Sequence, residues 1–502
     1  MIDHRRTLRA IADISRLFTW TFLAPVPVAF LMEPWNLHVL GLTMPATVPA
    51  FAAGAAACTL FWLPVRLLTT DDAENLRDRE GYLAVALGWL VLSAFAAIPF
   101  LASGTLPNVI DAFYEAISGL TTTGASAFRV DLATVPESIL FWRAFLQWIG
   151  GLGIVVLLVA LLAQLTQGGH ALMRAEASAH AEQRVRPKLR DTAKTLWRIY
   201  SLITLGMILV LWALMLRIDM SPGQALYDAV YHAFTAYATG GFSNHSNSIA
   251  YYNDFYIEAA ITVFMLIGGT QILLFLPGPK NFLKRLWNDA QWRFYILTFA
   301  VAVALVAAML IRTDYTAPTA LRHASFAVAT TLTGTGLSAH DFAPWPAGSL
   351  AILLALMLMG GNVGSTSGAV KSARWLLMAK LVKRQLRLHL HPRAVIPARL
   401  GGRVIPEATL IMTGAFIFLY LTAWLLGTLS FLVLEPFDII DAASASASTL
   451  GNVGVGLGAV GPTGSYATMQ PASKIIMAFL MWLGRLELFT VLLVFNPNSW
   501  KT

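Results

Sequence analysis

Long apolar stretches recur along the chain, separated by short segments in which charged residues gather. Residues 82–101 (YLAVALGWLVLSAFAAIPFL) contain no charged side chain over 20 positions. A helix needs about 20 mostly apolar residues to cross the hydrocarbon core of a bilayer. The pattern therefore predicts ten membrane-spanning helices, near 17–32, 37–63, 82–101, 144–164, 199–216, 255–276, 294–311, 349–369, 409–434 and 475–495.

The overall composition agrees with a membrane protein. Of the 502 residues, 57% are hydrophobic and 12% are charged, whereas soluble domains carry about 25% charged residues. Most Lys and Arg residues fall on one side of the membrane if the spans alternate, at 1–16, 65–81, 167–195, 279–293 and 371–403. Because Lys and Arg are retained on the cytoplasmic side, we expect both termini to be cytoplasmic. The net charge of +8 then reports topology and does not indicate a nucleic-acid partner.

Four connections on the opposite, outer side share one internal pattern. Each begins at a proline, continues through a short helical stretch and ends in a glycine cluster, over Pro107–Ser126, Pro222–Ser243, Pro318–Ser338 and Pro436–Gly458. The spacings from the proline to a key glycine are 17, 18, 16 and 18 residues, which selects Gly124, Gly240, Gly334 and Gly454. Such a period indicates an internal fourfold repeat.

A proline suits the first turn of a helix, where its missing N–H has no partner to lose. A helix of about 12 residues is only ~18 Å long, too short to cross a bilayer. The chain must then return outward as non-helical backbone, which is tolerated at membrane depth only where it is buried in protein or lines water. We therefore expect an all-α polytopic membrane protein, with four pseudo-symmetric units of helix, half-helix, filter strand and helix around one pore. The expected division is a two-helix segment at 1–70 and repeats at 71–166, 167–280, 281–400 and 401–502.

The stretch GLTTTGASAF, from Gly119 to Phe128, shows what each strand offers. Its glycine can adopt backbone angles denied to other residues, so that the strand carbonyls can replace the water around a dehydrated cation, as in potassium-channel filters. One such stretch alone is more typical of a tight turn, but four at equivalent positions favour a filter. The expected ion-binding residues are Thr122, Thr123, Gly124, Ala238, Thr239, Gly240, Leu332, Thr333, Gly334, Asn452, Val453 and Gly454.

Four further motifs connect the chain to a known family: QWIGGLGIVVL (Gln147–Leu157), RPKLRDTAKTLW (Arg186–Trp197), GGNVGSTSGAVKSAR (Gly360–Arg374) and GRLELFTVLLVF (Gly484–Phe495). With these motifs the sequence resembles the Trk/Ktr/HKT superfamily of cation transporters, most closely its TrkH-type bacterial members. The resemblance implies potassium uptake across the bacterial cytoplasmic (inner) membrane, with one glycine per repeat that favours potassium. The transported ion is then the only metal, and we expect neither an enzyme nor a cofactor.

Two interruptions in the later spans are candidate gating elements. Small and polar residues break the span that starts at 349, at Gly360, Gly361, Gly364, Ser365, Thr366 and Gly368. They hold a helix poorly, although a close helix contact is the alternative. Arg485 lies near the centre of the last span, where a charge is costly and usually functional; an inert pair with Glu487 is the alternative. The resemblance implies that the broken segment is a gate below the filter and that Arg485 projects into the pore as an electrostatic barrier.

Three aspartates lie within two turns of the half-helix prolines: Asp111, Asp228 and Asp441. They either offset the helix dipole or form a cation-attracting vestibule, and the sequence leaves both possibilities open.

The resemblance also implies partners, which are a soluble, nucleotide-binding cytoplasmic regulatory subunit of the TrkA type and a second copy of the chain. The basic segments 371–403 and 167–195 are the expected docking surface for the regulator, unless they only determine topology. The rival functions are a sodium-permeable or ion-coupled cation transporter of the same fold, an inverted-repeat secondary transporter and a membrane enzyme. Whether transport is passive, proton-coupled or nucleotide-regulated stays open.

Overall fold

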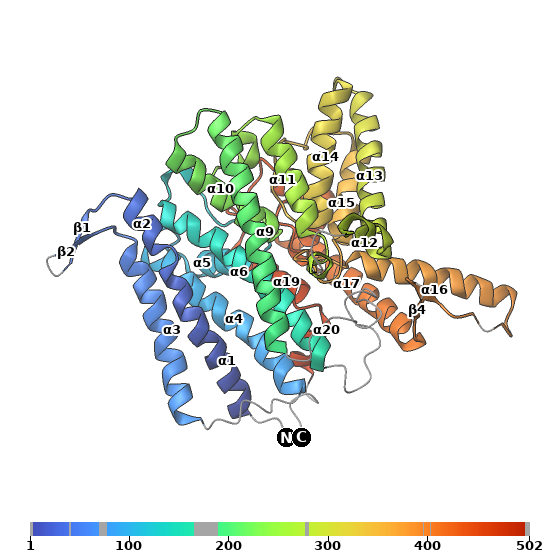
Figure 1. Ribbon diagram of the computed structural model, residues 1–502, viewed down its shortest axis with the longest axis horizontal. Coiled ribbons are helices and arrows are strands. Elements are labelled where there is room, and N and C mark those ends of the chain that lie inside the picture. Colours follow the sequence, from blue (N-terminus) through green and yellow to red (C-terminus); the bar gives the residue numbers. More distant parts are fainter. Residues whose placement is uncertain are drawn as a thin grey trace.

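The computed structural model describes residues 4–39, 42–69, 78–164, 189–276, 281–394, 396–401 and 403–496. The described chain is almost wholly helical, as expected (Figure 1). Its strands form two short antiparallel hairpins, which pair β1 (Leu37–Val39) with β2 (Leu42–Met44) and β3 (Arg399–Leu400) with β4 (Arg403–Val404). The all-α polytopic fold class is confirmed.

Six helical runs of the described residues are long and apolar enough to cross a membrane. The first is His4–Met32, which joins α1 (His4–Thr19) to α2 (Val26–Met32). The others lie in α3 (Val48–Leu68), α4 (Asp78–Ala102), α9 (Leu189–Arg217), α13 (Ala290–Ile311) and α17 (Glu407–Leu434). The helix α6 (Glu137–Gln164) has 28 residues, while α11 (Phe255–Gly268) and α15 (Ala347–Met359) are shorter apolar helices.

Three expected spans differ in shape from the sequence-based prediction. The one expected at 255–276 is shorter, because its helix ends at Gly268. The span expected from residue 37 begins only at Val48, because residues Leu37–Val39 and Leu42–Met44 pair as the β1–β2 hairpin. The last span is bent by 120° between α19 (Pro471–Arg485) and α20 (Phe489–Phe495). The bend lies at Glu487 and Leu488, whose φ angles are +57° and +37°.

Four short helices occupy the outer connections: α5 (Val109–Leu120), α10 (Pro222–Tyr237), α14 (Ala317–Thr333) and α18 (Ile439–Leu450). They contain 12, 16, 17 and 12 residues, so none of them is as long as the ~30 Å hydrocarbon core. Each packs between the helix before it and the helix after it, as in the sets α4–α5–α6, α9–α10–α11, α13–α14–α15 and α17–α18–α19. We call these four helices the half-helices.

Contacts between the four sets close into a ring. The half-helix α10 packs on α6 of the first set, α14 packs on α11 of the second, and α18 packs on α15 of the third. The half-helix α5 of the first set packs on α19 of the fourth, which completes the circle. Segments far apart in the sequence therefore surround one common axis.

Not every half-helix begins at the proline from which its start was predicted. Pro222 is the first residue of α10, but Pro107 and Pro436 precede the caps of α5 and α18. Asn108 accepts hydrogen bonds from the amides of Ile110 and Asp111, and Asp438 accepts the equivalent pair. A side-chain cap satisfies the free N–H groups of a first turn. The helices α5 and α18 therefore start after their caps, Asn108 and Asp438, and not at the proline.

Two further helices connect or extend the spans. The helix α12 (Phe282–Asn288) precedes α13, and α16 (Ser372–Leu390) projects sideways from the bundle in Figure 1. Lys380 and Arg384 of α16 donate hydrogen bonds to the carbonyls of Arg399 and Ile396, which holds the β3–β4 hairpin against this helix.

Candidate functional site: four strands and a broken helix

The four return strands leave their half-helices in the same way. In each, one backbone N–H donates to the carbonyl five residues earlier at 2.8 Å: Thr123 to Ser118, Gly240 to Thr235, Thr335 to Thr330 and Val453 to Ser448. The residue before each donor has a positive φ, of 53° at Thr122, 52° at Thr239, 69° at Gly334 and 53° at Asn452. These two features align the strands by their conformation and not by their distance from a proline.

The residue after each donor is a glycine with a φ between 80° and 90°: Gly124, Gly241, Gly336 and Gly454. A Cβ atom added to Gly124 would lie 2.1 Å from the carbonyl oxygen of Gly240, and one added to Gly241 would lie 1.9 Å from that of Thr335. A Cβ added to Gly336 would lie 1.9 Å from the carbonyl oxygen of Val453, and one added to Gly454 would lie 2.1 Å from that of Thr123. The contacts run from repeat to repeat and return to the first, so the four strands form a closed ring.

A cavity of about 270 Å³ opens at this ring, and all four of these glycines line it. Ser126, Ser243 and Ser338, each two residues after its glycine, line it too. One cavity therefore touches equivalent residues of every repeat, as a central pore mouth requires.

The sequence-based alignment of the strands is wrong in two repeats. Gly240 and Gly334 do not correspond to Gly124 and Gly454, because Gly241 and Gly336 occupy that place. Three other expected residues precede the strands: Ala238 is the C-cap of α10, and Leu332 and Thr333 are the last residues of α14. The aligned strand residues are Thr122, Thr123, Gly124, Thr239, Gly240, Gly241, Gly334, Thr335, Gly336, Asn452, Val453 and Gly454.

The expected interruption in the span from 349 is real. The helix α15 ends at Met359, and α16 begins at Ser372. Positive φ angles occur at Gly360, Gly364, Ala369 and Lys371, which are incompatible with a continuous helix. We call the segment 360–371 the broken segment.

The broken segment is held under the strands by backbone contacts from two other repeats. The amide of Asn362 donates to the carbonyl of Gly269 at 2.9 Å, and the Thr366 hydroxyl lies 2.9 Å from the carbonyl of Tyr237, where α10 ends. A Cβ added to Gly368 would lie 2.2 Å from the carbonyl of Gly451, the C-cap of α18. The small residue Gly368 thus allows close approach to the end of the half-helix α18, and Gly361 allows close approach to Gly269 at the end of α11.

Arg485 is buried beside the broken segment. Its guanidinium donates to the carbonyl of Thr366 at 2.7 Å and to the carbonyl of Gly150 at 3.1 Å. Its side chain therefore joins the broken segment to the second span of the first repeat. Glu487 is not its partner, because that carboxylate pairs with Lys371 at 3.1 Å and with Arg374 at 2.7 Å.

A family model described as a cation transport protein, TrkH, matches residues 47–502. The chain belongs to the TrkH family. Two similar proteins are the Trk system potassium uptake proteins TrkH of Salmonella typhimurium (strain LT2) and Escherichia coli (strain K12), each 36% identical over 99% of both chains. The crystal structure of the potassium transporter TrkH from Vibrio parahaemolyticus is similar over 100% of both chains, with a TM-score of 0.86 at 31% identity.

The three aspartates of the half-helices are engaged by protein groups in this TrkH-family chain. Asp111 pairs with Lys474 at 2.5 Å, and Asp441 accepts from the amide of Ala459 at 3.0 Å. Asp228 is fully buried and accepts from Gln224, Asn244, His245 and Tyr252. These contacts connect each half-helix to a loop or, for Asp111, to the helix α19. They support a bracing role for the aspartates and not an open ring of carboxylates.

The loops that follow the first two strands are tied together by hydrogen bonds. Ser246 donates its hydroxyl to Asp131 at 2.6 Å and accepts the amide of Leu132 at 3.1 Å. The hydrogen bond from Ser246, with one from the Ala133 amide, lowers the pKa of the Asp131 carboxyl. The outer ends of the first and second repeats are therefore coupled as well.

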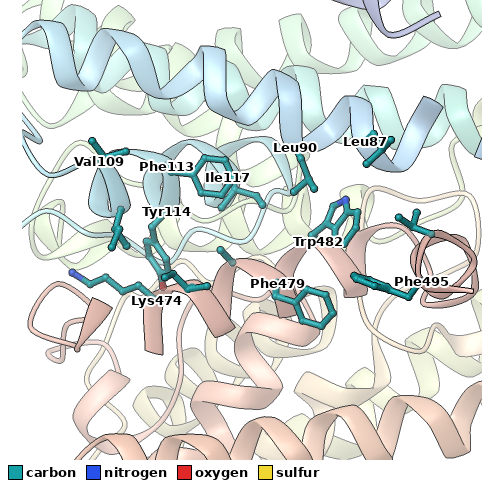
Figure 2. A pocket seen from close by; sticks show the side chains of 14 residues that line it. Leu87, Leu90, Val109, Phe113, Tyr114, Ile117, Lys474, Phe479, Trp482 and Phe495 are labelled. Carbon is teal, nitrogen blue, oxygen red and sulfur yellow. The ribbon is translucent and has the colours of Figure 1, made fainter. Parts of the chain in front are cut away.

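A second cavity lies away from the ring and is not an ion route. It has a volume of about 550 Å³ and lies between α4, α5, α19 and α20, with the apolar side chains of Phe113, Phe479 and Phe495 along it (Figure 2). Its one charged residue, Lys474, is neutralised by Asp111. A dehydrated cation finds no free polar group there to replace its water.

Sequence reasoning missed Gly241, Gly336 and two groups of polar residues. Glu115, Arg143 and Gln147 hydrogen-bond to residues of the first two strands and the loops after them. Lys371 and Arg374 pair with Glu487 at the bend. A signal for the glycines exists in the sequence, because Gly124, Gly241 and Gly336 each precede a serine by two positions. The charged residues had no such signal, since their partners are more than 25 positions away along the chain.

Proposed function

We propose that this chain carries potassium ions into the bacterial cytoplasm through the ring of four strands. The TrkH family to which it belongs consists of cation transport proteins, and full-length relatives are named as potassium uptake proteins. The observation that carries the proposal is the closed circle of glycine–carbonyl contacts, from Gly124 through Gly241 and Gly336 to Gly454. Backbone carbonyls in four such strands supply oxygen ligands that can replace the hydration shell of the ion.

In this proposal the ion-binding residues are the aligned strand residues, three from each repeat. A glycine at the ring position of all four strands favours potassium over the sodium-permeable alternative, since each strand can come equally close to its neighbour. The side chains of Thr123, Thr335 and Asn452 support the backbone: Thr123 accepts from the Asn452 amide at 3.0 Å, and Thr335 hydrogen-bonds Thr333 at 2.6 Å.

The gate is assigned to the broken segment together with Arg485. The segment lies against the C-terminal ends of α10 and α18, on the side of the strands opposite the pore mouth. A guanidinium is positive at every accessible pH, so it opposes a cation that leaves the filter toward the cytoplasm. Release of Thr366 from Arg485 is the opening step in this proposal.

The topology and partners are proposed from charge distribution and family. Both termini are placed in the cytoplasm, and the division into five segments at 70, 166, 280 and 400 stays a prediction. The name "Trk system" of the relatives refers to a system of several components, which supports a soluble regulatory subunit of the TrkA type. Basic residues of α16 are its proposed docking surface; most of 167–195 lies outside the described residues. A homodimer is proposed on the same family grounds.

The test is ion flux through the purified protein in liposomes. Wild-type protein should carry potassium in preference to sodium, and Gly241→Ser should reduce that preference, because its Cβ and hydroxyl displace the Thr335 carbonyl. Imposed proton gradients and an added soluble partner would distinguish passive, coupled and regulated transport. A potassium-to-sodium ratio that is unchanged in the folded variant would refute the filter assignment.

A further inference from the structure

A buried ion pair lies directly behind the first two strands. The Nε of Arg143, on α6, donates to Glu115 of the half-helix α5 at 2.6 Å, and both side chains are at most 1% exposed. The other two guanidinium nitrogens reach the strands, since Nη2 donates to the Ser126 hydroxyl at 3.0 Å and Nη1 donates to the Ser243 carbonyl at 3.1 Å. One arginine therefore links strand residues of two neighbouring repeats.

The carboxylate of Glu115 completes the link. It accepts the backbone amide of Ala127 at 2.6 Å and the Ser126 hydroxyl at 3.3 Å. The guanidinium also lies 4.1 Å from the ring centroid of Phe242, the residue that follows Gly241. The pair thus contacts four residues that lie within three positions of a ring glycine, at Ser126, Ala127, Phe242 and Ser243.

A second side chain on the same face of α6, Gln147, also hydrogen-bonds to the second strand. Gln147, one helical turn after Arg143, donates from Nε2 to the Gly240 carbonyl at 2.6 Å and accepts the Phe242 amide at 3.2 Å. The carbonyl of Gly240 is the one that faces Gly124 across the ring. Two side chains of α6 therefore fix the backbone of the second strand from Gly240 to Ser243.

The second and fourth repeats have no charge at the matching positions of their second spans. Gly150, Gly268 and Gly484 align the second spans, because each approaches the last carbonyl of its half-helix, at Leu120, Tyr237 and Leu450. The residues seven positions before these glycines are Arg143, Ile261 and Met477. The residues three positions before the same glycines are Gln147, Met265 and Met481. Of these three repeats, only the first carries polar residues at both positions, and the second and fourth carry buried apolar residues there.

The half-helices show the same asymmetry. Glu115 lies seven positions before Thr122, and its counterparts before Thr239, Gly334 and Asn452 are His232, Ala327 and Ala445. Taking two charges out of water is costly, and well-packed apolar residues in place of a buried pair are often as stable or more stable. The fourth repeat has apolar residues at both matching positions, Ala445 and Met477, so a buried ion pair is not needed for packing alone.

We propose that Glu115 and Arg143 are positioning residues for ion selection, which fix the spacing between the first and second strands. This inference rests on the proposed function of the strands as a potassium filter. The planar guanidinium donates in three fixed directions, whereas a lysine ammonium is a point charge on a flexible stem. The pair thus makes the seam between the first two repeats stiffer than a packed apolar contact does.

The test measures the potassium-to-sodium permeability ratio in liposomes for Arg143→Lys and for the double variant Glu115→Ala/Arg143→Met. The double variant carries the residues found at the matching positions of the fourth repeat, Ala445 and Met477. We expect the ratio to fall about tenfold in both, the effect of losing one charge-assisted hydrogen bond. The double variant should still fold, because it leaves no unpaired buried charge.

A matched control is Arg322→Lys, on the half-helix α14. Arg322 also bridges two repeats through a carboxylate, with both of its hydrogen bonds, each 2.7 Å, made to Glu258 of α11. The permeability ratio should not change in this variant. An unchanged ratio in the folded double variant overturns the positioning role, and so does an equal fall in Arg322→Lys.

Failure of this inference is distinguishable from failure of the filter itself. If Gly241→Ser lowers the ratio while the Arg143 variants do not, the filter stands and the ion pair is structural. If Gly241→Ser leaves the ratio unchanged, the strands do not select the ion, and the inference falls with the proposal on which it rests.

Discussion

Arg485 donates a 2.7 Å hydrogen bond to the backbone carbonyl of Thr366, so the fourth repeat is directly connected to the broken segment of the third. Thr366 in turn lies 3.2 Å, hydroxyl to hydroxyl, from Thr239 at the start of the second strand. A single chain of contacts thus joins the proposed barrier residue, the proposed gate and the proposed filter. Movement of any one of the three must break a contact made by another.

Removing the charge of Arg485 should increase potassium flux. At ~6 Å and an effective dielectric constant of ~20, a guanidinium repels a potassium ion by roughly 3 kcal/mol, which slows passage about a hundredfold. Arg485→Gln should therefore be faster than wild type, and Arg485→Lys should keep most of the restriction. Flux in liposomes, normalised to folded protein, measures this, and a glutamine variant no faster than wild type would contradict the barrier role.

Deleting Gly361–Gly368 should raise flux and reduce its dependence on a regulatory partner. The deletion removes Thr366 from the carbonyls of Tyr237 and Gly268, so the space under the strands opens. Flux with and without the soluble partner measures both effects. Complete loss of transport in a protein that still folds in the membrane would show that the segment is structural packing.

Glu487→Gln should destabilise the protein through Lys371 and Arg374. These side chains are each 4% exposed, and Glu487 is the carboxylate that pairs with both of them. Removing one member of a buried ion pair costs about 3 kcal/mol or more, and the cost here is lower because Glu487 itself is 22% exposed. Thermal unfolding in detergent should show a clear loss of melting temperature.

The control is Glu407→Gln, whose carboxylate is 64% exposed and pairs with Arg384. An exposed pair of this kind is worth about 0–1 kcal/mol. Equal melting temperatures for both variants would be evidence against this role of Glu487.

The two candidate glycines of the third strand should respond differently to substitution. Gly334 takes the position that Thr122, Thr239 and Asn452 take in the other strands, so Gly334→Asn should preserve the potassium-to-sodium ratio. Gly336→Ala should lower the ratio, because its Cβ would lie 1.9 Å from the Val453 carbonyl. The same flux assay on both variants decides between the two alignments. If Gly334→Asn loses selectivity and Gly336→Ala does not, the alignment by conformation is wrong.

The existence of four half-helices followed by glycine strands could be predicted from the sequence, because the signals for it are local. Apolar length, a proline near the start and small residues at the end each act within a few positions. The interruption at Gly360 and the buried charge at Arg485 are local in the same sense. These features, with the distribution of Lys and Arg, were enough to predict a polytopic pore protein.

Only the tertiary structure decided which glycine of each cluster belongs to the ring. Counting residues from the proline selected Gly240 and Gly334 instead. The count fails because the length of a half-helix depends on its cap and its packing, and these differ between α5 and α14. The position of Gly241 and Gly336 is set by carbonyls of the neighbouring repeat, at Thr335 and Val453. The partner of Glu487 was decided in the same way, since Lys371 and Arg374 come close only when the helix bends. Contacts between distant segments have no counterpart in local pattern, and this is the physical reason that the alignment needed the fold.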